Sequence, residues 1–155
     1  MANTVLVRDY MTPSPHSIGV TLTQADARNM MRAYQIRHLP VLDRGQLVGL
    51  LSDRDVQAFE AAAAARRNDV TVEEAMSQAV YTVSPTTPLQ VCALHMARHK
   101  LGSAVAMEGA RVVGVFTATD ALRALAEVLK ALDEKPARLH MPPDAPEEEA
   151  QRQGR

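Results

Sequence analysis

Two stretches of the chain, at residues 49–55 and 114–120, carry the same pattern of residues. The first reads Gly-Leu-Leu-Ser-Asp-Arg-Asp, and the second reads Gly-Val-Phe-Thr-Ala-Thr-Asp. The same offset along the chain matches Val7 with Val72 and Met11 with Met76. A duplication of this kind is typical of two supersecondary units that share one core, so a site built at the repeated pattern should occur twice.

The composition indicates a globular chain with an aliphatic core. Of 155 residues, 46% are hydrophobic but only 3% are aromatic, and tryptophan is absent. Leucine, valine, methionine and alanine must therefore fill the core. Cys92 is the single cysteine, which excludes an internal disulfide. Its place on an apolar helix face indicates a buried, inert thiol, and this fits a reducing cytoplasm.

Hydropathy and charge exclude several classes of protein. No apolar run approaches the roughly 18 residues of a membrane span, and the first residues lack the basic start and apolar stretch of a signal peptide. The net charge is −1, and basic and acidic residues balance outside residues 134–155. Nucleic-acid binding would call for clustered excess lysine and arginine. We therefore expect a cytoplasmic protein that binds neither nucleic acid nor a membrane.

Hydrophobic periodicity predicts the same order of elements in each repeat: a short helix, a strand, a helix, two strands and a helix. Single helical turns are expected around residues 7–11 and 72–76. Residues 39–42 and 46–51 form one predicted hairpin, and residues 103–107 and 111–116 form the other. The residues at helical spacing on the apolar faces of the two middle helices are Ala27, Met30, Met31, Tyr34, Leu89, Cys92, Ala93 and Met96.

These elements predict an α/β (α+β) fold made of two repeats, each a small sheet with packed helices. The first repeat covers residues 1–66 and the second covers residues 67–133. Residues 134–155 hold four of the nine prolines and few large apolar side chains. Such a segment cannot offset the entropy of ordering, so we expect a disordered tail.

The repeated pattern places a hydroxyl residue at a helix start and a carboxylate three residues later. Ser52 with Asp55, and Thr117 with Asp120, can each form a capping box that satisfies free amides. The same geometry suits a nucleotide, because a helix N-terminus offers N–H groups and a positive dipole end to phosphate. The carboxylate can accept the two hydroxyls of a ribose. The sequence leaves both interpretations open.

The order and spacing of several motifs resemble those of a cystathionine β-synthase (CBS) domain. The first repeat has Met-Thr-Pro at 11–13, Ile-Arg-His-Leu-Pro-Val-Leu-Asp at 36–43 and the pattern at 49–55. The second repeat keeps Met76 and residues 114–120 but has Leu-Gly-Ser-Ala-Val at 101–105. The resemblance covers residues 3–132. It implies a tandem pair, or Bateman module, with a pseudo-twofold axis.

The resemblance also implies a function and an assembly. Such pairs commonly dimerise, and their clefts commonly hold adenosine-containing ligands. We therefore expect a regulatory, energy-sensing homodimer that binds AMP, ADP, ATP or a related compound, requires no cofactor and acts on a protein target that the sequence does not identify. The alternative is a scaffold or dimerisation unit whose clefts are empty. An enzyme is disfavoured, because no nucleophile or acid–base pair recurs in both repeats.

The two repeats differ in charge around the repeated pattern. The first adds Arg54 within it and has Arg37 and His38 before the preceding strand, where the resemblance implies phosphate contacts. The second has Thr119 in place of Arg54, and Gly-Ser at 102–103. Since arginine forms the stronger charge-assisted bonds to phosphate, the first repeat should favour phosphorylated ligands. Arg37 and His38 could instead belong to a solvated turn.

Two further features bear on metals and assembly. His95 and His99 have the i, i+4 spacing of metal ligands, but no third ligand is evident nearby, so no metal is expected. The last helix carries Leu122, Leu125, Leu129 and Leu132 on one face. This face is expected to meet a second chain across a twofold axis. The alternative is that it packs within the pair, against the helix at residues 56–65.

Overall fold

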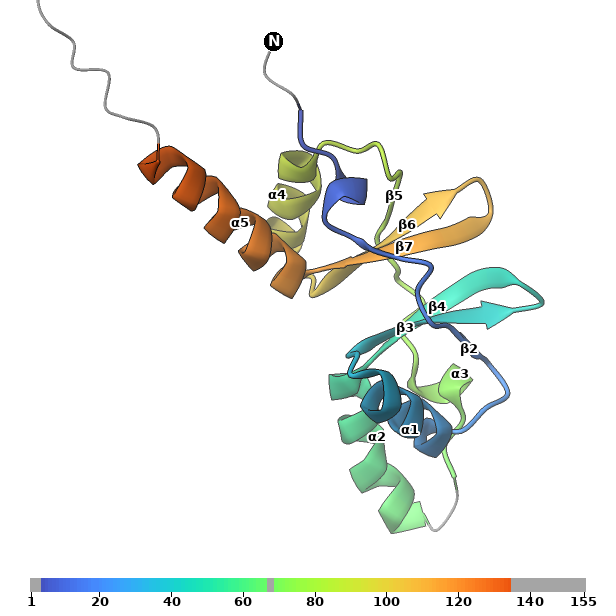
Figure 1. The fold of residues 1–155 in the computed structure, drawn as a ribbon. Coiled ribbons are helices and arrows are strands. Elements are labelled where there is room, and N and C mark those ends of the chain that lie inside the picture. The colour runs from blue at the N-terminus through green and yellow to red at the C-terminus, as the bar shows by residue number, and fades with distance from the viewer. Residues whose placement is uncertain (1–3, 67–68, 135–155) are drawn as a thin grey trace, which may run out of the picture.

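The protein consists of two units, each a small sheet with helices, which lie one above the other in Figure 1. The computed structural model describes residues 4–66 and 69–134. One sheet has three strands in the order β2-β3-β4, and the other has four in the order β1-β7-β6-β5. The α/β (α+β) prediction with two repeats is confirmed.

The order of elements along each repeat is close to the predicted one. The elements of the first repeat are η1 (Val7–Asp9), β1 (Thr12–Pro13), β2 (Ile18–Gly19), α1 (Gln24–Tyr34), β3 (His38–Asp43), β4 (Gln46–Ser52) and α2 (Asp53–Arg66). The elements of the second repeat are α3 (Val72–Ala75), β5 (Thr82–Val83), α4 (Leu89–His99), β6 (Ser103–Glu108), β7 (Arg111–Thr117) and α5 (Ala118–Asp133). Residues 134–155 were expected to be disordered; apart from Glu134 they lie outside the described residues.

Both predicted hairpins are present, and both carry the same irregularity. Arg44 and Gly45 link β3 to β4 with φ angles of 48° and 81°, the positive values that a tight two-residue hairpin turn requires. Gly109, with φ of 59°, opens the turn between β6 and β7. The register shifts at Val41/Leu42 in one hairpin and at Ala106/Met107 in the other, which are matching positions of the duplication.

The first segment of each repeat packs on the unit formed by the other repeat. Val7 belongs to the core that contains Cys92 and Phe116, whereas Val72 belongs to the core that contains Leu39 and Leu51. Strand β1 pairs with β7. At the matching place in the other unit, Ser77 bridges to Leu50. The two units therefore exchange segments, and neither core is built from one repeat alone.

Backbone hydrogen bonds repeat this exchange with the offset of the duplication. The N–H of Val72 donates to the carbonyl of Leu22 at 2.8 Å, and the N–H of Val7 donates to the carbonyl of Thr87 at 2.9 Å. Within the exchanged segments, Met76 lies against Gly49 in β4, and Met11 lies against Gly114 in β7. This correspondence is the pseudo-twofold relation between the repeats.

Of the eight positions predicted for the apolar helix faces, four are buried, three are half-buried and one is exposed. Ala27, Met31, Cys92 and Met96 are all at most 4% exposed. Burial raises the pKa of the Cys92 thiol, as expected for an inert cysteine. Tyr34 differs from the prediction: it is 51% exposed, and its ring stacks on His16 with the centroids 3.6 Å apart.

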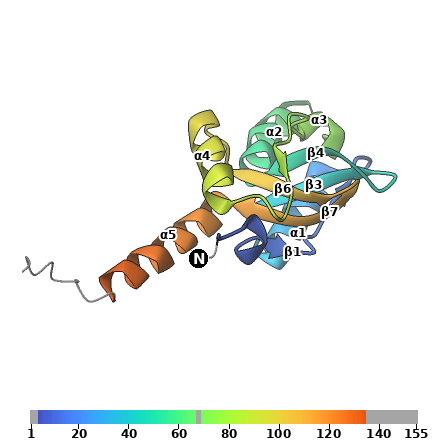
Figure 2. The ribbon, with the colours of Figure 1, turned by 90° about the horizontal axis from the view of Figure 1, so that it is seen from above.

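Helix α5 runs away from the sheets in both views (Figures 1 and 2). Leu122, Leu125, Leu129 and Leu132 are between 51% and 66% exposed. The alternative that this face packs inside the pair is therefore wrong, because the helix diverges from the body after Ala124, its last buried residue. Among the described residues, no helix combines the length and hydropathy that crossing a bilayer requires.

Candidate ligand-binding site

Strand β4 delivers Ser52 to the start of α2, where it forms a capping box with Asp55. The backbone N–H and the hydroxyl of Ser52 donate to Oδ2 of Asp55 at 2.9 and 2.5 Å. The N–H of Asp55 donates back to the Ser52 hydroxyl oxygen at 3.1 Å. The second carboxylate oxygen, Oδ1, has no hydrogen-bond or ion-pair partner within residues 4–66 and 69–134.

Strand β7 delivers Thr117 to the start of α5 in the same way. Its N–H and hydroxyl both donate to Oδ2 of Asp120 at 2.9 Å, and the Asp120 N–H donates to the Thr117 hydroxyl oxygen at 3.3 Å. Here the second oxygen is also used, because Nη2 of Arg123 lies 3.1 Å from Oδ1. The capping-box interpretation is confirmed in both repeats. Because each capping box uses Oδ2, the hypothesis that the carboxylate accepts ribose hydroxyls depends on Oδ1.

The residues before each central strand lie beside these boxes, as the motif requires. The hairpin register sets His38 opposite Ser52 and Ser103 opposite Thr117. The N–H of Asp53 donates to the Arg37 carbonyl at 2.8 Å, and the N–H of Ala118 donates to the Gly102 carbonyl at 2.9 Å. Each box therefore forms one cluster with the residues that precede its hairpin.

His38 brings the two clusters together. A Cβ atom built on Gly102 would lie 3.4 Å from Nε2 of His38, so the imidazole of the first repeat reaches the turn before the box of the second. Burial lowers the pKa of His38 from its ordinary 6.5. The charges of Asp55 and Asp53 oppose this effect, and that of Arg37 adds to it. The solvated-turn interpretation is therefore wrong for His38, whereas Arg37 is exposed.

The remaining predicted contacts lie on the surface at the helix starts. Arg54 and Thr119 occupy matching positions and are both exposed. Neither Arg37 nor Arg54 forms an ion pair with another described residue. Two guanidinium groups without an ion-pair partner among the described residues thus lie close in sequence to the capping box of the first repeat. Such groups favour an anionic ligand.

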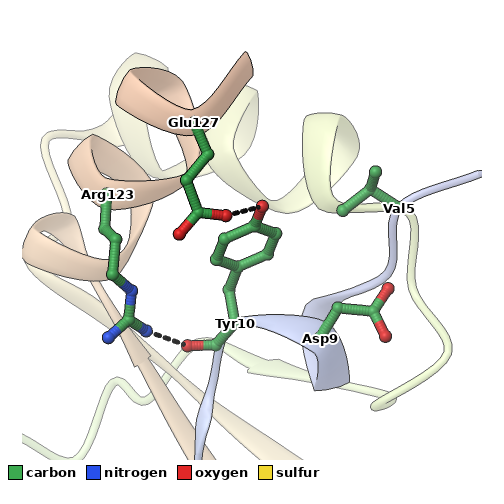
Figure 3. A pocket seen from close by; sticks show the side chains of 5 residues that line it. All are labelled: Val5, Asp9, Tyr10, Arg123 and Glu127. Atoms are coloured by element: carbon green, nitrogen blue, oxygen red, sulfur yellow. Dashed lines mark hydrogen bonds between the residues drawn. The ribbon is translucent and has the colours of Figure 1, made fainter. Parts of the chain in front are cut away.

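Three polar residues near the second box were not anticipated from the sequence. Tyr10 donates its hydroxyl to Oε2 of Glu127 at 2.6 Å, and this bond raises the pKa of Tyr10. Arg123 donates to the Tyr10 carbonyl at 3.0 Å. With Val5 and Asp9 these residues line an open hollow of about 470 Å³ between η1 and α5 (Figure 3). No local pattern indicates this cluster, because its members come from opposite ends of the described chain.

The histidine pair on α4 forms part of an aromatic column. The ring of His95 stacks between Tyr81 and His99, with centroid distances of 4.1 Å on both sides. Nδ1 of His99 lies 3.0 Å from the His95 carbonyl. Within the part of the chain that the structure describes, no three histidine, cysteine, aspartate or glutamate residues converge as a metal site.

Comparison with known proteins gives one family and several related structures. The model of the CBS domain family matches the chain twice, at residues 7–61 and 72–127. A solved structure of a Vibrio cholerae protein named acetoin utilization protein AcuB is 30% identical, with a TM-score of 0.74. The match covers 86% of this chain and 99% of that one.

Two further relatives carry more specific names. The CBS domain pair of protein MJ0100, solved in complex with 5′-methylthioadenosine and S-adenosyl-L-methionine, is 26% identical with a TM-score of 0.70, and the match covers 81% of this chain and 99% of that one. L-aspartate semialdehyde sulfurtransferase of Methanocaldococcus jannaschii is 30% identical over 120 residues, which are 76% of this chain. The chain spans only 23% of the length of that enzyme.

Proposed function

Because the chain belongs to the CBS domain family, with two CBS domains in tandem, we propose that it is a regulatory module that binds an adenosine-containing ligand where its two repeats meet. CBS pairs are typically regulatory modules, and the similar pair of MJ0100 was solved with two adenosine compounds. The observation that carries the proposal is the meeting of the two box clusters at His38 and Gly102.

Each residue of the proposed site has a physical role. The carboxylate oxygen of Asp55 that the helix cap does not need can accept ribose hydroxyls, and the matching oxygen of Asp120 could do so in competition with Arg123. Ser52 and Thr117 fix the helix starts, where the positive end of the helix dipole favours negative charge. Arg37, His38 and Arg54 supply positive charge or donors for a phosphate, whereas Thr119 offers only a neutral donor.

The ligand class can be tested by thermal unfolding with AMP, ADP, ATP, 5′-methylthioadenosine and S-adenosyl-L-methionine, each at millimolar concentration. A ligand at 100 times its dissociation constant stabilises the native state by about 2.7 kcal/mol. For a chain of this size the expected rise in Tm is about 5–10 °C. Guanosine and cytidine monophosphates are the matched controls. If none of the adenosine compounds raises Tm, the proposal fails.

An assembly role is a second candidate, favoured by the leucine face of α5. A helix whose large apolar residues are more than half exposed is unusual in a monomer and typical of a surface that meets a partner. We propose that the partner is a second copy of the chain, joined by a self-complementary interface. This role is compatible with ligand binding, and it becomes the sole function if the clefts bind nothing.

A further inference from the structure

The two boxes differ in what surrounds their carboxylates. Arg123 contacts Asp120 and also donates to the Tyr10 carbonyl, and the Tyr10 hydroxyl donates to Glu127. Figure 3 shows the hydrogen bonds of Tyr10 with Arg123 and Glu127. The offset of the duplication matches Tyr10, Arg123 and Glu127 with Ala75, Ala58 and Ala62. The duplication has therefore kept the two boxes while giving only the second this set of polar neighbours.

One of these residues, Arg123, gives the second carboxylate a partner on its remaining oxygen. Oδ2 of Asp120 accepts both bonds from Thr117, and Oδ1 is held by Arg123. The Asp120 side chain is only 11% exposed, whereas that of Arg123 is 57% exposed. Arg123 also donates to the Tyr10 carbonyl, which fixes its position. A ribose hydroxyl would have to compete with this guanidinium for Oδ1 of Asp120.

The first carboxylate has no such competitor within the part of the chain that the structure describes. Ala58 stands where Arg123 stands in the second repeat, and Oδ1 of Asp55 has no partner among the described residues. Arg37 and Arg54 belong to this side, while Gly102 and Thr119 take their places on the other. The carboxylate oxygen without a partner among the described residues and the two matched arginines thus belong to the first repeat.

We propose that the chain binds one adenosine ligand, at Asp55, and that the Arg123–Asp120 ion pair keeps the matching position of the second repeat closed. This inference rests on the proposed function and selects between its two sites. Displacing an ion pair and a hydrogen bond disfavours the second site by about tenfold or more in affinity.

Titration calorimetry with AMP and with S-adenosyl-L-methionine tests the assignment on the full chain. The wild type should bind one ligand per chain. Asp55→Asn should weaken binding at least tenfold. Asp26→Asn is the matched control, because Asp26 forms the same capping box with Thr23 at the start of α1 but lies outside the two clusters. Circular dichroism checks that each variant is folded.

Exchanging the distinguishing residue gives a second test. Arg123→Ala should open a second site and raise the stoichiometry to two. Ala58→Arg places a guanidinium three residues after Asp55, as Arg123 is placed after Asp120, and should reduce affinity. Two equal sites in the wild type, loss of binding with Asp120→Asn rather than Asp55→Asn, or binding only in Arg123→Ala would each overturn the assignment. The proposed function itself fails if no variant binds any ligand.

Discussion

A single aspartate in this fold has two oxygens with separate tasks. In both repeats Oδ2 completes the capping box, so the cap alone accounts for a carboxylate at this position. What remains for a ligand is decided by the second oxygen. Among the described residues that oxygen has no partner at Asp55, whereas at Asp120 it is occupied. Two copies of the same sequence pattern can therefore differ in their ability to bind a ligand because of one neighbouring side chain.

At the same scale, Arg54 should discriminate between ligands by their charge. Arg54→Ala is expected to weaken AMP binding by about 1.5–3 kcal/mol, the usual value for hydrogen bonds to charged groups, and to leave adenosine binding nearly unchanged. Calorimetry with both ligands measures the ratio of the two affinities. Arg32→Ala, which removes an exposed arginine of α1, serves as the control. An unchanged ratio would show that Arg54 does not contact phosphate.

His38 should make the stability of the ligand-free protein depend on pH. Burial lowers its pKa below 6.5 in the folded chain, so the unfolded chain binds more protons between that lowered pKa and 6.5. The free energy of unfolding should therefore be highest above pH 6.5 and fall as the pH decreases below it. Urea unfolding between pH 5 and 8 measures this slope. His38→Gln should flatten the slope, and His16→Gln, at an exposed histidine, should not; a slope that His38→Gln leaves unaltered would assign the effect to other groups.

At the scale of the elements, the exchanged segments depend on two glycines that allow close approach. A Cβ at Gly49 would overlap the Met76 sulfur and lie 3.0 Å from the Ser77 carbonyl oxygen, whereas the three atoms nearest to a Cβ at Gly114 all belong to the Met11 side chain. A methionine side chain can adjust its rotamer, but a backbone carbonyl in a bridge to Leu50 cannot move as freely. The two glycines are therefore not equivalent.

Gly49→Ala should destabilise the protein by about 1–3 kcal/mol, the usual cost of overpacking, and Gly114→Ala should cost less. Urea unfolding of the two variants gives the comparison. Gly19→Ala is the control, since a Cβ there meets nothing within 4 Å and the residue does not have a positive φ. Equal losses at both glycines would mean that the methionine contacts alone set the cost.

The elements themselves could be predicted from the sequence, because helices, hairpins and turns follow from local periodicity and from residues such as Gly45. The duplication then predicted the second copy of each element. The exchange of Val7 and Val72 between cores could not be predicted in the same way, since a short apolar segment fits either core equally well. The hydrogen bond of Arg123 with the Tyr10 carbonyl could not be predicted from the sequence, because it depends on how η1 packs against α5.

At the scale of the whole molecule, the leucine face of α5 predicts a homodimer. Ultracentrifugation at tens of micromolar protein should give a species of twice the 16.9 kDa chain mass. The double variant Leu125→Glu with Leu129→Glu should give the single-chain mass, because two buried charges without partners oppose association. Leu22→Glu, at a residue 42% exposed outside α5, is the control. A single-chain mass for the wild type would exclude the dimer.

Truncation after Glu134 should leave this dimer intact. The removed segment contributes only Leu139 and Met141 as large apolar residues, whereas the leucine face lies wholly within α5. The same sedimentation measurement on the shortened chain checks this expectation. Dissociation on truncation would assign the tail a part in the interface.

The exchange of segments also bears on how such a chain could have arisen. A single repeat of this kind would lack the hydrophobic contribution that Val7 or Val72 makes to the opposite core. Two separate copies could supply it to each other by domain swapping, a low-cost route to a symmetric dimer. Gene duplication with fusion would then turn an intermolecular swap into an intramolecular one, and it would free the two copies to diverge. The arginine at position 123, opposite the alanine at 58, is a difference that no dimer of identical repeats could carry.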